Sequence, residues 1–230
     1  MNTNIAIVTC YTPAIKELVA PLSANKQEYC DRWGYKFFLE IEDWDEVAKC
    51  KSGGFYKIDY LLRLMMEHPE IEVFVWMDND AFVMDQTLPL ENFNSDADLM
   101  IGEDWNGINV GVFFIKNNPK CLDFLEKVYN YQPTQFESRP YWWARSEQCA
   151  ISNLMDSSDI TVDLHHHWLF NGYITEPRPD NDWRRLGLCP RNPNWKPKQF
   201  QMGDFILHFA GIHNHEKPQL IEEYIQKVIK

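Results

Sequence analysis

Five consecutive apolar residues, Val73–Met77, are followed directly by Asp78, Asn79 and Asp80. An apolar run of this length predicts a strand that is buried on both faces, as the central strands of a parallel sheet are. Carboxylates at the end of such a strand lose solvation, and a partner has to compensate for this loss. Because no Lys or Arg lies within four residues of either aspartate, a bound cation is the simplest partner.

The segment that leads to this run alternates between predicted strands and helices. Strands are expected over residues 5–10, 35–41 and 73–77. Thr12 and Pro13 are typical of a helix start, so a helix is expected from there to about Trp33. A second helix follows Gly53-Gly54, with apolar residues at helical spacing. This β-α-β-α-β order predicts an α/β fold with a doubly wound, mostly parallel sheet flanked by helices.

The rest of the chain extends the same fold. After Asp80 we expect a loop to Pro89, strands over 98–102, 108–115 and 205–209, helices over 119–131, 145–155 and 217–229, and an ordered surface loop over 175–202. The sequence contains no internal repeat and no linker. We therefore expect one domain over residues 1–230, with a nucleotide-binding half over about 1–80 and an acceptor-binding half over about 81–230.

The composition excludes several classes of partner. The formal net charge is −12, which repels polyanions and argues against nucleic acid or an anionic membrane. The six cysteines show no paired or zinc-type spacing, so we expect reduced thiols. No leader and no membrane-spanning apolar stretch is found in the sequence, which predicts a soluble, cytoplasmic protein of bacterial or viral type, unless the chain is part of a longer, membrane-anchored, Golgi-type enzyme.

The position of the two aspartates favours a metal site. Ligands of open α/β sheets bind beyond the carboxyl ends of the strands, and oxygen ligands suit Mn²⁺ or Mg²⁺. His208, alone in an apolar strand, is the candidate third ligand. The alternative for Asp78 and Asp80 is that they cap the following turn. The alternative for His208 is that it is a core histidine without a ligand. The loop with His213 and Lys217 is a candidate contact for a diphosphate.

Four stretches together resemble glycosyltransferase family 34. They are FYKIDYLLRLMMEHPEIEVFVWMDNDAFVMD, INVGVFFIKN, SEQCAI and LHFAG. This family includes plant xyloglucan xylosyltransferases and fungal galactosyl- and mannosyltransferases. The resemblance implies a single GT-A domain, a nucleotide-sugar donor, a manganese cofactor and retention of the anomeric configuration. The family's metal-binding residues correspond to Asp78, Asp80 and His208.

The resemblance also implies roles for other residues, each taken from the matching position. Lys57 matches a lysine near the donor, Asn109 the Asn of an NTG-type motif, and Gln148 the Gln of an Asp-Gln pair. Glu147 stands where that pair has Asp. His213 stands where many members have a diphosphate-binding lysine, so Lys217 is expected to contribute. Thr9, Tyr11 and Asn79 are expected to contact the nucleotide, with UDP preferred over GDP.

The expected reaction uses Glu147, Gln148 and Asn109 as catalytic residues. Glu147 either stabilises positive charge on the sugar ring or attacks it, and the acceptor is a glycan or another hydroxyl compound. Trp105, Trp143 and His167 are the candidate acceptor-binding residues, with core packing as the alternative for the tryptophans. Three rival functions are a metal-dependent sugar-binding module, a DxD phosphatase of haloacid-dehalogenase type and an inverting GT-A enzyme. The phosphatase motif DxDxT is not matched, because Phe stands at position 82.

Overall fold

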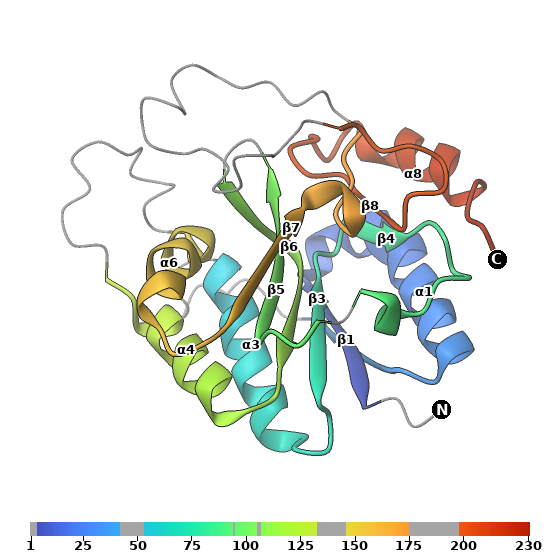
Figure 1. The fold of residues 1–230 in the computed structure, drawn as a ribbon. Helices are drawn as coiled ribbons and strands as arrows, with labels where there is room; N and C mark the ends of the chain where they lie inside the picture. The colour runs from blue at the N-terminus through green and yellow to red at the C-terminus, as the bar shows by residue number, and fades with distance from the viewer. Residues whose placement is uncertain (1–3, 42–52, 94, 105–106, 133–145, 175–197) are drawn as a thin grey trace.

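A computed structural model describes residues 4–41, 53–93, 95–104, 107–132, 146–174 and 198–230 (Figure 1). Its main sheet has six strands in the order β2-β1-β3-β6-β5-β7. Their bounds are β1 Ile5–Tyr11, β2 Lys36–Ile41, β3 Val73–Met77, β5 Leu99–Asp104, β6 Gly107–Lys116 and β7 Val162–His166. Within this sheet only β6 runs against the others, since it is antiparallel to both β3 and β5. The predicted α/β class with a mostly parallel sheet is confirmed.

Helices cover both faces of the sheet (Figure 1). One face packs against α3 Gly53–Glu67, α4 Pro119–Asn130 and α6 Glu147–Leu154. The other face packs against α1 Lys16–Trp33, beyond which lies α8 Lys217–Ile225. The apolar side chains of the helices and the sheet form the core between these layers, which explains why all five residues of β3 are buried.

A small second sheet joins two distant segments. Strand β4, Ala81–Val83, pairs with β8, Ile206–His208, in antiparallel register, with Ala81 opposite His208. The sequence predicted a loop after Asp80, and that prediction is wrong for β4. A strand of three residues is too short for a periodic pattern, and its partner lies far downstream.

Two further boundaries differ from the sequence prediction. Thr12 makes no side-chain cap, and a 3-10 turn, Pro13–Ile15, precedes α1 at Lys16. Helix α8 ends at Ile225, before the expected position 229. In contrast, α4 begins as predicted, since the Asn118 side chain accepts a hydrogen bond from the Cys121 N–H and Pro119 takes the first turn. The loop predicted over 175–202 lies largely outside the described residues.

The topology gathers polar residues at one edge of the sheet. Strands β1, β3, β5 and β7 all end at this edge, and β6, which runs the other way, begins there. The register between β5 and β6 shifts between Ile101 and Gly102, so Asn109 pairs with Gly102 and the backbone after Asn109 is freed from β5. The end of β3, the start of β6 and the end of β5 therefore lie side by side at this edge.

Candidate functional site

A cleft of about 250 Å³ opens at the carboxyl end of β3. It is lined by Cys10, Gly54, Lys57, Trp76, Asp78, Asn79, Asp80 and Glu147. These residues come from the ends of β1 and β3 and from the first turns of α3 and α6. The cleft lies where ligands bind in open α/β sheets.

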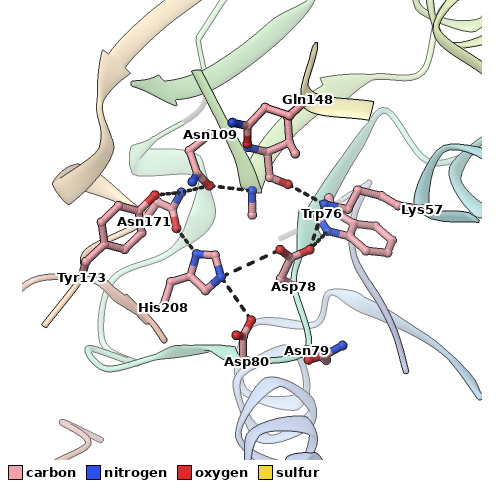
Figure 2. A network of polar contacts seen from close by, with 12 residues as sticks. Lys57, Trp76, Asp78, Asn79, Asp80, Asn109, Gln148, Asn171, Tyr173 and His208 are labelled. Carbon is pink, nitrogen blue, oxygen red and sulfur yellow. Dashed lines mark hydrogen bonds and ion pairs between the residues drawn. The ribbon is translucent and has the colours of Figure 1, made fainter. Parts of the chain in front are cut away.

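The two oxygens of each carboxylate, Asp78 and Asp80, have different partners, and Figure 2 shows those of Asp78 and the contact of Asp80 with His208. Asp78 Oδ1 accepts a hydrogen bond from Trp76 Nε1 at 2.7 Å and lies 2.9 Å from Lys57 Nζ. Asp80 Oδ2 accepts from Lys217 Nζ at 2.7 Å. The other oxygens, Asp78 Oδ2 and Asp80 Oδ1, lie 3.8 and 3.1 Å from His208 Nε2.

These contacts correct the expectation that a bound cation is the simplest partner for the aspartates. Protein cations reach both of them from distant segments: Lys57 from α3 and Lys217 from α8. Lys26 of α1 is fully buried and donates a 3.4 Å hydrogen bond to the main-chain oxygen of Asn79. The acids therefore have protein partners, so their burial alone does not require a metal.

Burial and charge shift the pKa values of these groups. Burial lowers the pKa of Lys26 to about 8, although Asp80 and Asp78 oppose the change. For Lys57, burial also favours the neutral form, but Asp78 and Glu147 outweigh it and raise the pKa above the usual value. Burial of Asp80 favours its protonated form, yet His208 and Lys217 hold its pKa well below the usual range. Asp80 is therefore an anion.

His208 is placed by the pairing of β4 with β8 and by a glycine. The register sets His208 opposite Ala81, next to Asp80. A Cβ atom on Gly111 would lie 2.2 Å from His208 Cε1, so only glycine leaves room for the ring. His208 Nδ1 lies 2.7 Å from the Oδ1 atom of Asn171, and its Nε2 atom faces the two carboxylates.

The donor set fits a divalent cation. Asp78, Asp80 and His208, which we call the Asp–Asp–His cluster, offer two oxygens and one ring nitrogen that lie within 4.8 Å of one another. The His208 ring nitrogen that is not directed at the acids is held by an amide oxygen, as is usual for metal-binding histidines. Both lysines contact the carboxylate oxygens on the far side from the ring, which leaves the facing oxygens available.

Glu147 and Gln148 begin α6 and face the cleft and the start of β6. The Ser146 side chain caps the helix by accepting from the Cys149 N–H. Glu147 Oε1 lies 3.5 Å from Lys57 Nζ, and its carboxylate packs where a Cβ on Gly54 would stand, 1.8 Å from Oε2. Gln148 Oε1 accepts a 3.4 Å hydrogen bond from the Val110 N–H. The structure thus places Glu147 in the lining of the cleft and Gln148 against the start of β6.

Asn109 lies deeper, beside the Asp–Asp–His cluster. Its Oδ1 atom accepts from the Gly111 N–H at 2.8 Å and from Asn171 Nδ2 at 2.8 Å. Its Nδ2 atom donates to Asp104 Oδ2 at 3.1 Å. Asn109 therefore belongs to a hydrogen-bond network behind His208.

The predicted nucleotide contacts lie at different depths. Asn79 donates a 3.2 Å hydrogen bond to the Cys10 main-chain oxygen, which ties the end of β3 to the end of β1. Tyr11 ends β1 and is buried, while Thr9 is fully buried and its hydroxyl has no hydrogen-bond partner among the residues that the structure describes. His213 is exposed on the loop before α8, and Lys217 is buried against Asp80.

The predicted acceptor residues remain predictions. Trp105 and Trp143 lie outside the described residues. The His167 ring is fully buried, stacks on Tyr173 and has its nitrogens 3.1 and 3.3 Å from the main-chain oxygens of Glu103 and Lys198. Burial lowers the pKa of His167 to about 4, against the opposing effect of these hydrogen bonds.

Sequence reasoning missed Lys26, and it did not separate Asn171 from its neighbours. Lys26 shares the buried face of α1 with Val19, Leu22 and Tyr29 at helical spacing, so a lysine on an apolar stripe was the available signal. Asn171 stands between Phe170 and Gly172, and nothing in the sequence links it to His208.

Across the helices that the structure describes, none has both the length and the apolar character that a bilayer crossing requires.

The sequence of this chain is similar to those of a known protein family and of individual enzymes. The sequence profile of the galactosyl transferase GMA12/MNN10 family matches residues 2–94 and 91–219. An uncharacterized alpha-1,2-galactosyltransferase of Schizosaccharomyces pombe is 22% identical over 256 residues, which span 91% of this chain and 68% of that protein. Xyloglucan 6-xylosyltransferase 2 of Arabidopsis thaliana is 30% identical over 135 residues, 54% of this chain but only 28% of that protein.

Solved structures share the fold. A glycosyltransferase involved in glycosylation of the major capsid of PBCV-1 superposes with a TM-score of 0.69 at 17% identity, covering 95% of this chain and 98% of that one. The galactosyltransferase LgtC, solved with donor and acceptor sugar analogs, gives a TM-score of 0.51 at 12% identity, covering 98% and 96%. At these identities the likeness concerns the fold, which is of the GT-A type.

Proposed function

Because this chain belongs to the galactosyl transferase GMA12/MNN10 family, we propose that it transfers a sugar from a nucleotide-diphosphate sugar to a hydroxyl group of a glycan or another acceptor. The observation that carries the proposal is the Asp–Asp–His cluster at the mouth of a cleft that also holds Lys57 and Glu147. The proposed donor is a UDP-hexose or UDP-pentose in preference to a GDP-sugar, and the proposed cation is Mn²⁺ or Mg²⁺.

Charge balance supports joint binding of cation and nucleotide. Three carboxylates, Asp78, Asp80 and Glu147, lie among three lysines, Lys26, Lys57 and Lys217, so their formal charges cancel. A diphosphate alone would add about two to three negative charges, and a divalent cation alone would add two positive ones. Together they add little net charge. Each is therefore expected to bind more tightly when the other is present.

The chain's own residues have distinct roles in this proposal. Asp78, Asp80 and His208 would hold the cation, which when bound supplies Lewis-acid stabilisation of the departing diphosphate. Asn79, between the two aspartates, connects the end of β3 to β1 through its hydrogen bond. Lys217 contacts the Asp80 carboxylate from the side of the His213 loop, where the phosphates are proposed to bind. Thr9 and Tyr11 would lie near the nucleobase of the donor, within the half formed by residues 1–80.

Glu147 is proposed as the carboxylate nearest the sugar. The acceptor hydroxyl would attack the anomeric carbon from the face that the diphosphate leaves, with retention of configuration and the proton passing to a donor phosphate oxygen. Glu147 then stabilises positive charge on the ring, or forms the first bond in a double displacement. Gln148 and Asn109 flank the Val110 backbone and are proposed to contact the sugar. Acceptor contacts from Trp105, Trp143 and His167, in the half formed by residues 81–230, complete the proposal.

Donor hydrolysis tests this function without knowledge of the acceptor. The protein would be incubated with UDP-galactose, UDP-glucose, UDP-xylose and GDP-mannose, with Mn²⁺ or with EDTA, and release of the nucleoside diphosphate measured. We expect release from one uridine donor, reduced about a hundredfold or more by EDTA or by Asp80→Asn, the size of losing one charge-stabilising group.

The products separate the mechanisms and the rivals. NMR of the released or transferred sugar should show the anomer of the donor, and the opposite anomer would refute retention. A covalent sugar on Glu147 would establish double displacement. Glycan binding with no nucleotide binding would favour a sugar-binding module, and release of phosphate from sugar phosphates would favour a phosphatase.

A further inference from the structure

Asn171 lies behind the metal-facing histidine and is completely buried. Its Oδ1 atom is 2.7 Å from His208 Nδ1. Its Nδ2 atom donates to Asn109 Oδ1 at 2.8 Å and to the Tyr173 hydroxyl at 3.2 Å. One amide therefore connects the Asp–Asp–His cluster with the network around Asn109, as Figure 2 shows.

Two groups that contact Asn109 can act only as a donor or only as an acceptor, and they determine the direction of the hydrogen bonds in this network. A main-chain N–H can only donate, and the Gly111 N–H donates to Asn109 Oδ1 at 2.8 Å. A carboxylate only accepts, and Asp104 Oδ2 accepts from Asn109 Nδ2 at 3.1 Å. The Asn109 amide is thereby oriented with its oxygen toward Asn171. Asn171 has to meet that oxygen with its NH₂ group.

A second route gives the same direction. The Tyr173 hydroxyl donates to Asp104 Oδ2 at 3.3 Å and so accepts from Asn171 Nδ2. Burial, with Asp104 as the next contribution, raises the pKa of Tyr173 well above its usual value, so the hydroxyl keeps its proton. Both routes direct the Asn171 NH₂ group away from His208 and leave only the Asn171 oxygen facing the ring.

The consequence for His208 follows from its two nitrogens. An oxygen that only accepts requires a proton on Nδ1. Because Nδ1 holds its proton, Nε2 is the ring nitrogen that can bind a cation held by Asp78 and Asp80, and Gly111, which has no Cβ, leaves space for the ring in this position.

We propose that Asn171 is a positioning residue that fixes the orientation and the Nδ1–H form of His208, and so sets the affinity of the Asp–Asp–His cluster for a divalent cation. The inference rests on the metal site of the proposed function. The competing role for Asn171 is structural alone: filling the core and satisfying Asn109 and Tyr173.

The test compares Mn²⁺ affinity, measured by calorimetry in the absence of nucleotide, across matched variants. Asn171→Leu removes the oxygen that faces His208, whereas Asn171→Asp keeps an oxygen there and loses the donor to Asn109. Asn117→Leu is the control: Asn117 is a partly buried amide whose NH₂ group donates to two main-chain oxygens, at 3.2 and 3.1 Å, and it follows β6 at the opposite edge of the sheet. Melting temperatures without metal report the structural cost of each change.

Asn171→Leu should weaken Mn²⁺ binding about 10- to 100-fold, the usual effect of removing a partner of a ligating histidine. Asn171→Asp should stay within about threefold of the wild type despite its lost donor, and Asn117→Leu should bind Mn²⁺ normally, although both leucine variants melt earlier. An Asn171→Leu affinity within about threefold of the wild type, or an equal loss in Asn171→Asp, would overturn the proposal.

A measurement on the wild type keeps the proposal testable if Asn171→Leu does not fold. In the Mg²⁺-saturated protein, long-range ¹H–¹⁵N spectra of His208 should place the proton on Nδ1; a proton on Nε2 would overturn the proposal. If the wild type binds neither Mn²⁺ nor Mg²⁺, the metal site of the proposed function fails and this inference fails with it. Metal binding that is indifferent to Asn171 refutes this inference alone.

Discussion

Lys57 provides a sharp test of the electrostatics of the cleft. Its ammonium group donates to the Val110 main-chain oxygen at 2.9 Å and lies 2.9 Å from Asp78 and 3.5 Å from Glu147. Lys57→Met keeps much of the side chain's length and removes the charge. Asp78 and Glu147 would then lose a shared counter-ion inside the fold.

The expected cost follows from burial. Removing one partner of a buried ion pair destabilises proteins by about 3–5 kcal/mol. The Lys57 side chain is 6% exposed but that of Asp78 is 31% exposed, so water solvates part of the stranded charge. We therefore expect the lower end, about 3 kcal/mol, or a fall of about 6–12 °C in melting temperature for a domain of this size.

The assay is denaturant unfolding in EDTA, repeated with Mn²⁺. Lys36→Met is the matched control because Lys36 pairs with Glu70 at the surface, where both side chains are about half exposed, and should cost no more than about 1 kcal/mol. Mn²⁺ should stabilise Lys57→Met more than the wild type, since a cation at Asp78 replaces part of the lost charge. A Lys57→Met protein as stable as Lys36→Met would show that Lys57 does not stabilise the fold through Asp78 and Glu147.

Three further predictions concern the same region. Lys217→Met removes a cation from Asp80, so Mn²⁺ alone should bind more tightly. If Lys217 contacts the phosphates, UDP in the presence of Mn²⁺ should bind about 10- to 100-fold more weakly. Calorimetry that shows both affinities moving in the same direction would contradict this. Gly111→Ala would place a Cβ 2.6 Å from His208 Nδ1, so the ring must move and Mn²⁺ affinity should fall about 10- to 100-fold, and unchanged affinity would show that the ring does not bind the metal. His167 titrates near pH 4 in the fold but near 6.5 when unfolded, so its contribution to stability is complete above pH 6.5 and is lost as pH falls toward 4. Between pH 7 and 4 the wild type should therefore lose about 3 kcal/mol relative to His167→Phe, and equal losses on denaturant unfolding would show that the buried ring is not responsible.

Local patterns accounted for the sheet and for the aspartates. The buried run that forms β3 and the helical spacing in α3 are properties of short segments, and they place Asp78 and Asp80 at a strand end without reference to the rest of the chain. The strand β4 and the position of His208 depend on each other through long-range pairing. The sequence offered His208 as a candidate ligand because it stands in a predicted strand, and the resemblance to a family supported that assignment, but the pairing of β4 with β8 was not predicted.

The partners of the aspartates could not be predicted from neighbouring sequence. Lys57 and Lys217 reach them from α3 and α8, and Lys26 comes from the buried face of α1. The absence of nearby cations in the sequence therefore said nothing about cations nearby in space. Asn171 is a similar case, because its role arises only where β8, β6 and the segment after β7 meet.

In the proposed function, a cation held by Asp78, Asp80 and His208 binds the diphosphate of the donor. Calorimetric titration of UDP into the wild type and into Asp80→Asn, each with Mn²⁺ and with EDTA, tests it most directly. We expect tight binding only for the wild type with Mn²⁺, and affinity at least about tenfold weaker, or 1.4 kcal/mol, in the other three titrations. Equal UDP affinity with and without Mn²⁺, or in Asp80→Asn, would contradict it and place the diphosphate away from the Asp–Asp–His cluster.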